Sequence, residues 1–308
     1  MSEHEGSKDT FERPDRHEGS KDTFERPDRL VSNRAKARLR RVAQVLVTVL
    51  LLLYVAIPLF WSVMSSVKPT GELYAALPTL LPRDFTLEHM RHLWFETGFP
   101  RYFFNSILVA VGATALTTVL ATLGGYGLTR SSFRGKRHLA RGILFTYMFP
   151  PILMAIPLYV IFFRLSALNN YFTLIVAHTA ISLPFGLWIM WQYFQSIPIS
   201  YEESAWMDGA SRLRTLWDVV LPLSRPGIVA VAIFTFAVSW NDYTMAVVIM
   251  TENSKYTHPV GVQTFIEQTG VNWGLIQAAG VGVMIPAFLI VLLLQRQLLT
   301  GFSVGEMG

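Results

Sequence analysis

Six long apolar segments constrain the fold of this chain more than any other feature. Hydrophobic residues make up 52% of its 308 residues and charged residues only 15%, which gives a mean hydropathy of +0.38. A helix of roughly 20 residues crosses the core of a bilayer and satisfies its own backbone hydrogen bonds there. The sequence therefore predicts an all-α, polytopic membrane protein with six transmembrane helices. We place these spans at about residues 42–64, 103–128, 140–163, 171–194, 224–250 and 276–296.

The distribution of Lys and Arg predicts the orientation of these spans. Residues 30–41 and residues 129–141 each carry five basic side chains, and the polar hairpin at about residues 198–227 carries three more. Basic loops are retained in the cytoplasm, so we expect both termini and this hairpin on that side. The net charge is +5, and the basic residues lie beside the spans, where anionic lipid headgroups attract them. Nucleic acid is therefore not an expected partner. The chain has no cysteine, which excludes disulfides and thiolate metal sites.

The N-terminal segment contains an exact duplication. Residues 4–16 and 17–29 are the same thirteen-residue string, with one Phe as the only large apolar residue in each copy. Such a string cannot bury a core, so we predict a disordered cytoplasmic tail at residues 1–34 and a membrane domain at residues 35–308. A regulatory docking tail and a simple duplication of the gene segment both remain open.

The polar hairpin has local signals for two short helices. Ser200 and Glu203 have the spacing of a capping box, which predicts the start of the first helix. Asp208-Gly209 should end it, because glycine adopts the left-handed conformation at little cost. Ser211 is placed to cap a second helix, which Pro222 and Pro226 should end. The apolar face predicted for that helix comprises Leu213, Leu216, Trp217, Val220 and Leu221.

Two interpretations of this hairpin fit the residues equally well. The first helix, with Glu202 and Glu203 expected to be exposed, could seat in a groove of a soluble protein while the second helix joins it to the bundle. Alternatively, the hairpin could lie on the lipid surface as an interfacial helix. An amphipathic face alone does not reveal whether lipid or another protein covers it.

A resemblance favours the first interpretation. The string Glu-Ser-Ala-Trp-Met-Asp-Gly-Ala at residues 203–210, followed by Val-Val-Leu-Pro-Leu at 219–223, resembles the EAA loop of bacterial ABC-importer permeases. The chain is most similar to the maltose-type, MalG-like carbohydrate-uptake permeases over roughly residues 35–308. Departures are Ser204 in place of the commoner alanine and the C-terminal end at residues 306–308. Further agreement comes from Asn105-Ser106, Tyr126-Gly127-Leu128-Thr129-Arg130, Phe149-Pro150-Pro151, Trp240-Asn241-Asp242 and Phe302-Ser303-Val304-Gly305.

The resemblance implies a mechanism and a set of partners. The first helix of the hairpin would be a coupling helix that docks on a cytoplasmic ATPase dimer. A second permease subunit would complete the pore in the bacterial inner membrane, and a solute-binding protein would deliver the sugar. This chain would bind no cofactor and would not itself be an enzyme, since ATP and Mg would be used by the partner ATPase. The residues implied in ATPase coupling are Ser200, Glu202, Glu203, Ala205, Asp208, Gly209 and Ala210.

Candidate solute contacts combine aromatic and polar side chains inside the predicted spans. Sugars suit aromatic faces with hydrogen-bonding groups beside them, and polar groups in a membrane are costly enough to need a role. For Asn241 and Asp242, interhelical hydrogen bonding is the alternative role, and for His178 packing is the favoured one. The prolines at 150, 151 and 157 should break or kink the third span. The substrate-lining candidates are Trp240, Asn241, Asp242 and Tyr243, with Trp188, Trp191 and Gln192 as secondary candidates.

Two other classes of protein receive less support. A secondary transporter needs intramembrane carboxylates for coupling ions, and Asp242 is the main such group within the predicted spans. An intramembrane enzyme needs a catalytic motif such as H-E-x-x-H or G-x-S-x-G, and neither occurs in the sequence. Among substrates, a disaccharide such as maltose or trehalose is the first expectation, while glycerol phosphate, polyols and other sugars remain open.

Overall fold

The computed structural model describes residues 27–77, 79–269 and 271–303, and all regular elements in these ranges are helices. Two units are distinguished, residues 1–58 and residues 59–308. In the first unit, helix α1 begins at Pro27 and its side chains from Arg38 to Pro58 are exposed. Residues 1–26 of the predicted tail lie outside the described residues, and residues 27–34 are helical rather than disordered. Pro27 suits the first position of a helix, and Arg29, Leu30 and Arg34 are good helix formers, which agrees with the earlier start.

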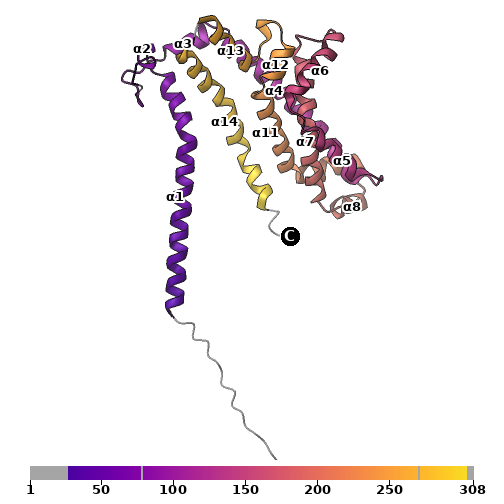
Figure 1. The fold of residues 1–308 in the computed structure, drawn as a ribbon. Helices are drawn as coiled ribbons and strands as arrows, with labels where there is room; N and C mark the ends of the chain where they lie inside the picture. Colours follow the sequence, from indigo (N-terminus) through magenta and orange to yellow (C-terminus); the bar gives the residue numbers. More distant parts are fainter. Residues whose placement is uncertain (1–26, 78, 270, 304–308) are drawn as a thin grey trace, which may run out of the picture. The chain divides into compact units, whose positions relative to one another are not determined.

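The membrane-spanning elements confirm an all-α polytopic membrane protein (Figure 1). Four helices are long and apolar enough to cross a bilayer, and two bent helix pairs bring the number to six if each pair is one span. Each of the six predicted segments overlaps one of these elements or pairs. The four continuous helices are α1 (Pro27–Ser66), α4 (Phe99–Arg130), α7 (Tyr171–Gln195) and α14 (Trp273–Ser303).

The third predicted span is broken, as its prolines indicated. It consists of α5 (Lys136–Thr146) and α6 (Pro151–Arg164), which meet at an angle of 92°. Pro150 and Pro151 have no N–H to donate, so the helix cannot continue through them. Asn170 caps the following helix, since its side chain accepts a hydrogen bond from the N–H of Phe172 at 2.8 Å.

The prediction of a continuous fifth span over residues 224–250 was wrong. Helix α11 (Arg225–Trp240) ends at its last tryptophan, and a separate short helix, α12 (Thr244–Ile249), follows a three-residue break. At the other end, α11 bends by 73° from the second helix of the hairpin. The remaining short elements flank the spans, and they are α2 (Thr70–Leu73), α3 (Glu88–Phe95), η2 (Asn253–Lys255) and α13 (His258–Thr269).

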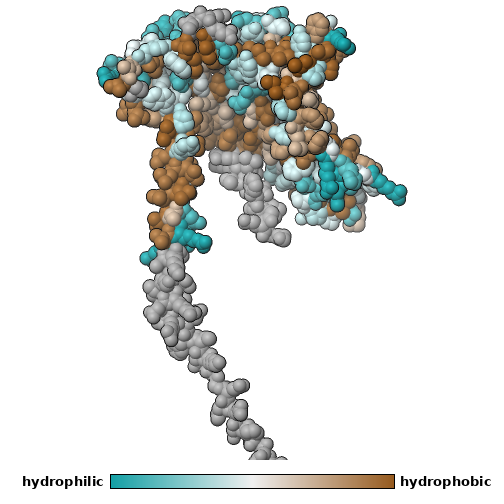
Figure 2. All heavy atoms as spheres, viewed as in Figure 1, coloured by the Kyte–Doolittle hydropathy of each residue, from teal (hydrophilic) through white to brown (hydrophobic). Residues whose placement is uncertain are grey.

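Helices α4, α7 and α11 pack against one another and form the centre of the second unit (Figure 1). Helices α4 and α7 approach closely at Gly125 of α4, where an added Cβ would lie 2.7 Å from the Cβ of Met190 and 2.9 Å from the backbone nitrogen of Trp191. Small residues allow such contacts between membrane helices. Figure 2 shows apolar side chains along the spans, and hydrophilic ones both at the end that carries α5 and α8 (Ser200–Met207) and over the opposite end.

Gly125→Ala is therefore expected to force α4 and α7 apart. Overpacking of this kind costs about 1–3 kcal/mol. The matched control is Gly127→Ala on the same helix, where nothing lies within 4 Å of the added Cβ. The thermal unfolding midpoint of the detergent-solubilised protein should fall for the first variant and stay unchanged or rise for the second; equal midpoints would contradict this packing.

Candidate functional site

Helix α8 forms the first arm of the polar hairpin and begins at Ser200 as predicted. The predicted capping box is wrong, because Ser200 already lies within the helix and Ile199 is the N-cap residue. Ile199 has helical backbone angles, and its carbonyl accepts hydrogen bonds from the N–H groups of Glu202 at 2.9 Å and Glu203 at 3.0 Å. The chain enters the helical conformation one residue earlier than the capping pattern requires, which leaves the Ser200 hydroxyl without a capping position.

The end of α8 is set by Gly209, in agreement with the sequence. Gly209 has a φ of 85°, a left-handed conformation that other residues adopt at a cost. Its N–H donates to the carbonyl of Trp206 at 3.0 Å, and the N–H of Ala210 donates to that of Ala205 at 2.9 Å. These two bonds form a Schellman motif, which satisfies the last carbonyl groups of the helix. The hairpin therefore has a defined bend.

The second arm begins as predicted but buries a different face. The Ser211 side chain accepts a hydrogen bond from the N–H of Arg214 at 3.3 Å and caps α9 (Arg212–Thr215). A π-helical turn follows, η1 (Leu216–Val220), and then α10 (Leu221–Leu223). A π turn inserts a residue and rotates the side chains after it. Of the predicted apolar face, Leu216 and Val220 are buried, whereas Leu213 and Trp217 are 72% and 67% exposed.

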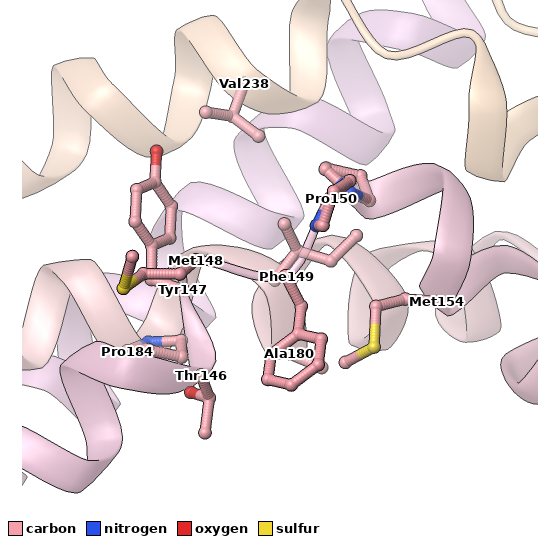
Figure 3. Close-up of a pocket in the computed structure, with 11 residues that line it drawn as sticks. Thr146, Tyr147, Met148, Phe149, Pro150, Met154, Ala180, Pro184 and Val238 are labelled. Atoms are coloured by element: carbon pink, nitrogen blue, oxygen red, sulfur yellow. The ribbon is translucent and has the colours of Figure 1, made fainter.

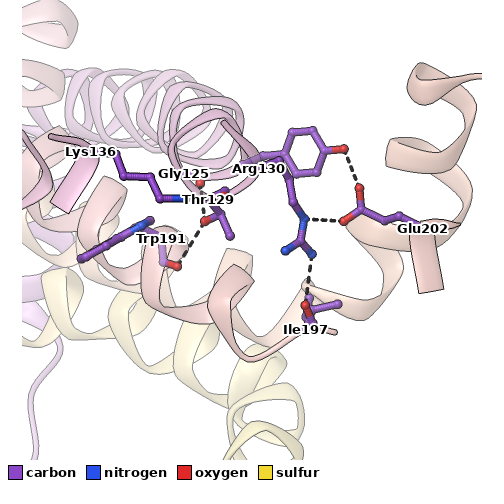
Figure 4. Close-up of polar contacts among 8 residues, drawn as sticks. Gly125, Thr129, Arg130, Lys136, Trp191, Ile197 and Glu202 are labelled. Atoms are coloured by element: carbon purple, nitrogen blue, oxygen red, sulfur yellow. Dashed lines mark hydrogen bonds and ion pairs between the residues drawn. The ribbon is translucent and has the colours of Figure 1, made fainter. Parts of the chain in front are cut away.

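Glu202 anchors α8 to the end of α4, and the expectation that it is exposed was wrong (Figure 4). Its side chain is 0% exposed, and one carboxylate oxygen lies 2.5 Å from Nε of Arg130. The other oxygen accepts a hydrogen bond from the Tyr126 hydroxyl at 2.8 Å. Nη2 of Arg130 also donates to the carbonyl of Ile197 at 3.1 Å. A buried carboxylate needs such partners, so these contacts explain its burial.

The outer surface of α8 is open. Glu203 and Asp208 are exposed, as is Met207 on the same short helix. Ala205 and Ala210 are partly exposed, and Ser200 is exposed. The hairpin thus holds one carboxylate inward on α4 and presents acidic and apolar side chains outward, which is a surface that another protein could cover.

The predicted solute contacts at the end of α11 divide into two groups. Trp240 is 1% exposed and packs on Phe103, Phe236 and His258, so it is placed as a core residue rather than a solute contact. Asp242 pairs with a neighbouring helix, which was the alternative role given for it. Its Oδ2 lies 3.1 Å from Nε2 of His178, a residue of α7.

The Asp242 carboxylate also caps α12, because the same oxygen accepts from the N–H groups of Met245 at 3.0 Å and Ala246 at 3.1 Å. Nδ1 of His178 lies 2.6 Å from the hydroxyl of Ser239 on α11. This histidine is therefore buried and fully partnered, and the packing role favoured for it agrees with its position. Asp242 holds α7, α11 and α12 together at the break in the fifth span.

The other candidates are more accessible. Asn241 and Gln192 are exposed, Tyr243 is 43% exposed and Trp188 is partly buried, whereas Trp191 is buried. Trp188 lies on α7 beside Phe185, within a cluster of aromatic rings. The structure brings Asn241 and Tyr243 together at one end of α11 and places Trp188 and Gln192 toward the hairpin end of α7.

Comparison with known proteins identifies the family of this chain. Residues 117–302, more than half of the sequence, match the family described as "Binding-protein-dependent transport system inner membrane component". The chain belongs to this family. Its predicted resemblance to ABC-importer permeases is thereby confirmed, and the hairpin lies within the matched residues.

Several curated relatives are similar to this permease over most of its length. The inner membrane ABC transporter permease protein YcjP of Escherichia coli is 32% identical over 83% of this chain and 92% of its own. The trehalose/maltose transport system permease protein MalG of Thermococcus litoralis is 31% identical over 87% of this chain and 97% of its own. The diacetylchitobiose uptake system permease protein NgcG of Streptomyces coelicolor is 32% identical over 82% of this chain and 83% of its own.

A solved structure shares the fold of this permease. It is the crystal structure of a bacterial ABC transporter involved in the import of the acidic polysaccharide alginate, with a TM-score of 0.74 and 23% sequence identity. The match covers 85% of this chain and 97% of the other.

Arg130 and Tyr126 are the partners of Glu202 that the sequence did not reveal. Both belong to the string Tyr-Gly-Leu-Thr-Arg that closes α4, which the resemblance included without assigning it a role. The available signal was an arginine at the end of an apolar span, the usual partner for a buried carboxylate.

Proposed function

We propose that this permease is the translocation subunit of an ATP-driven importer that moves a sugar into the cytoplasm by alternating access. Residues 200–210 act as the coupling helix, which docks on an ATPase dimer in the cytoplasm. Both termini of the chain lie on the same side of the membrane. A second permease subunit completes the pore, and a solute-binding protein delivers the sugar. The observation that carries this proposal is the buried contact between Glu202 and Arg130, because it transmits movement of α8 directly to the membrane helix α4.

A disaccharide such as maltose or trehalose is the proposed substrate. Relatives named for trehalose/maltose and diacetylchitobiose transport support a sugar of this size. A relative named for sulfoquinovosyl glycerol transport in Agrobacterium fabrum supports the broader alternative of a different small solute. Asn241, Tyr243, Trp188 and Gln192 remain the proposed solute contacts, since their side chains are at least partly accessible.

The proposal is tested by purifying the tagged permease together with the proteins encoded beside it. An ATPase subunit and a second permease should co-purify, and proteoliposomes with ATP inside and the solute-binding protein outside should accumulate radiolabelled maltose or trehalose. Transport driven by an ion gradient without ATP would contradict the proposal and favour a secondary transporter.

Gly209→Ala is expected to weaken coupling by straining the bend. Nothing lies within 4 Å of an added Cβ, so the cost comes only from the positive φ and amounts to about 1–2 kcal/mol. Gly142→Ala on α5 is the control, because its Cβ is also unobstructed and its backbone is helical. ATP-dependent uptake should fall several-fold for Gly209→Ala alone. Equal uptake by both variants would show that the bend has no part in coupling.

A further inference from the structure

The break between α5 and α6 opens a cavity inside the third span (Figure 3). Its volume is about 280 Å³, near the lower end of the range of about 300–1,000 Å³ typical of small-molecule pockets. Side chains of α7 and α11 form its other walls, so it lies among three spans. The residues that define it best are Tyr147, Phe149, Pro150, Met154, Pro184 and Val238.

The backbone at this break leaves a carbonyl group without its usual helical hydrogen bond. In a continuous helix the carbonyl of Tyr147 would accept from the N–H of residue 151, but Pro151 has none. Interrupted backbone within a membrane is tolerated where it is buried in protein or lines a polar cavity, and broken helices form the solute sites of many transporters. The Tyr147 carbonyl and hydroxyl thus bring hydrogen-bonding groups to a mostly apolar cavity.

A row of aromatic rings extends from Tyr147, which lines the same cavity. The ring of Tyr147 stacks on that of Phe185 with centroids 5.1 Å apart and an interplanar angle of 25°. Phe185 in turn stacks on Trp188 at 6.1 Å and 24°, and it contacts Phe234 of α11 at 4.4 Å. Rings from the end of α5, from α7 and from α11 therefore form one cluster beside the break. Tyr147 is 39% exposed, so part of its ring is available to a ligand.

We propose that this cavity is a subsite of this chain for one ring of the imported sugar. A pyranose has apolar C–H faces and a rim of hydroxyl groups, which match an aromatic face with a phenol and carbonyl groups beside it. A lipid tail would match the apolar walls but would leave these polar groups without partners inside the membrane. The subsite rests on the proposed function, because it requires that the imported solute is a sugar.

The test replaces the ring with an aliphatic side chain of similar size. Tyr147→Leu removes a ring that lines the cavity, and Phe185→Leu removes the ring that stacks on Tyr147 and positions it. Each should lower uptake of maltose or trehalose at subsaturating concentration by about three- to tenfold, since aromatic contacts are worth that much. Tyr147→Phe keeps the ring but loses the hydroxyl, so it should recover part of the uptake. The matched control is Tyr159→Leu, whose ring stacks on Phe163 at 5.9 Å along α6 and does not line the cavity.

Assembly is checked in every variant by the amount of co-purified ATPase subunit and by the unfolding midpoint. Reduced uptake with assembly intact, confined to Tyr147→Leu and Phe185→Leu, supports the subsite. Uptake by Tyr147→Leu and Phe185→Leu equal to that of Tyr159→Leu overturns it and indicates a lipid-filled or structural cavity. Failure of the proposed function would instead appear in the unsubstituted complex, as uptake without ATP or without an ATPase subunit.

Discussion

Arg130→Gln is expected to detach the hairpin from α4 and abolish ATP-driven uptake. Among the residues that the structure describes, the substitution leaves the Glu202 carboxylate, which is 0% exposed, with only the Tyr126 hydroxyl as a side-chain partner. Removing one member of a buried ion pair costs about 3–5 kcal/mol, because the remaining charge stays desolvated. We expect a lower unfolding midpoint for the complex and loss of the ATPase subunit during purification.

The chain provides a matched control for this prediction. Arg214 pairs with Asp218 at 3.2 Å in the same hairpin, but their side chains are 74% and 62% exposed. Exposed pairs contribute about 0–1 kcal/mol, so Arg214→Gln should have little effect on the unfolding midpoint. Similar losses from both substitutions would mean that the buried contact with Glu202 has no special role.

Asp242→Ala should produce the second large effect, at the other end of the bundle. It removes a hydrogen bond with the buried His178 and the cap of α12 in one step. A lost cap costs about 0.5–2 kcal/mol and a lost hydrogen bond to a charged group about 1.5–3 kcal/mol, so we expect a total of about 2–5 kcal/mol. The expected result is a lower unfolding midpoint together with reduced uptake.

Asn241→Ala tests whether this effect belongs to the carboxylate rather than to the break itself. The Asn241 side chain is exposed and donates one hydrogen bond, to the carbonyl of Ala237 on its own helix at 2.8 Å. Its replacement should change the free energy of unfolding by no more than about 0.5 kcal/mol, so the unfolding midpoint should barely move. If Asp242→Ala were equally mild, the contacts among α7, α11 and α12 would not depend on this residue.

Much of the fold could be predicted from the sequence because the signals are local or periodic. Long apolar runs identify the spans, the prolines at 150 and 151 identify a break, and Gly209 identifies the bend. Each of these depends on the chemistry of the residue and its near neighbours. The polytopic helical architecture and the sharp end of α8 follow from them.

The rest depends on contacts between distant residues. Nothing near Glu202 in the sequence reveals that Arg130, 72 residues earlier, lies beside it and buries it. The π turn after Thr215 also changes which side chains of the second arm are buried, and helical periodicity cannot anticipate it. The break after Trp240 was missed because the apolar sequence continues on both sides of Asn241 and Asp242.

Photo-cross-linking from the outer face of α8 is the most direct measurement of its role in coupling. The chain has no cysteine, so Glu203→Cys, at an exposed position, provides a unique attachment site for a maleimide photo-cross-linker in intact membranes. We predict one major protein adduct, with the ATPase subunit, whose yield changes when ATP is added. Adducts with lipid alone, or a cysteine that only reagents outside the cell can reach, would contradict the coupling role of this hairpin.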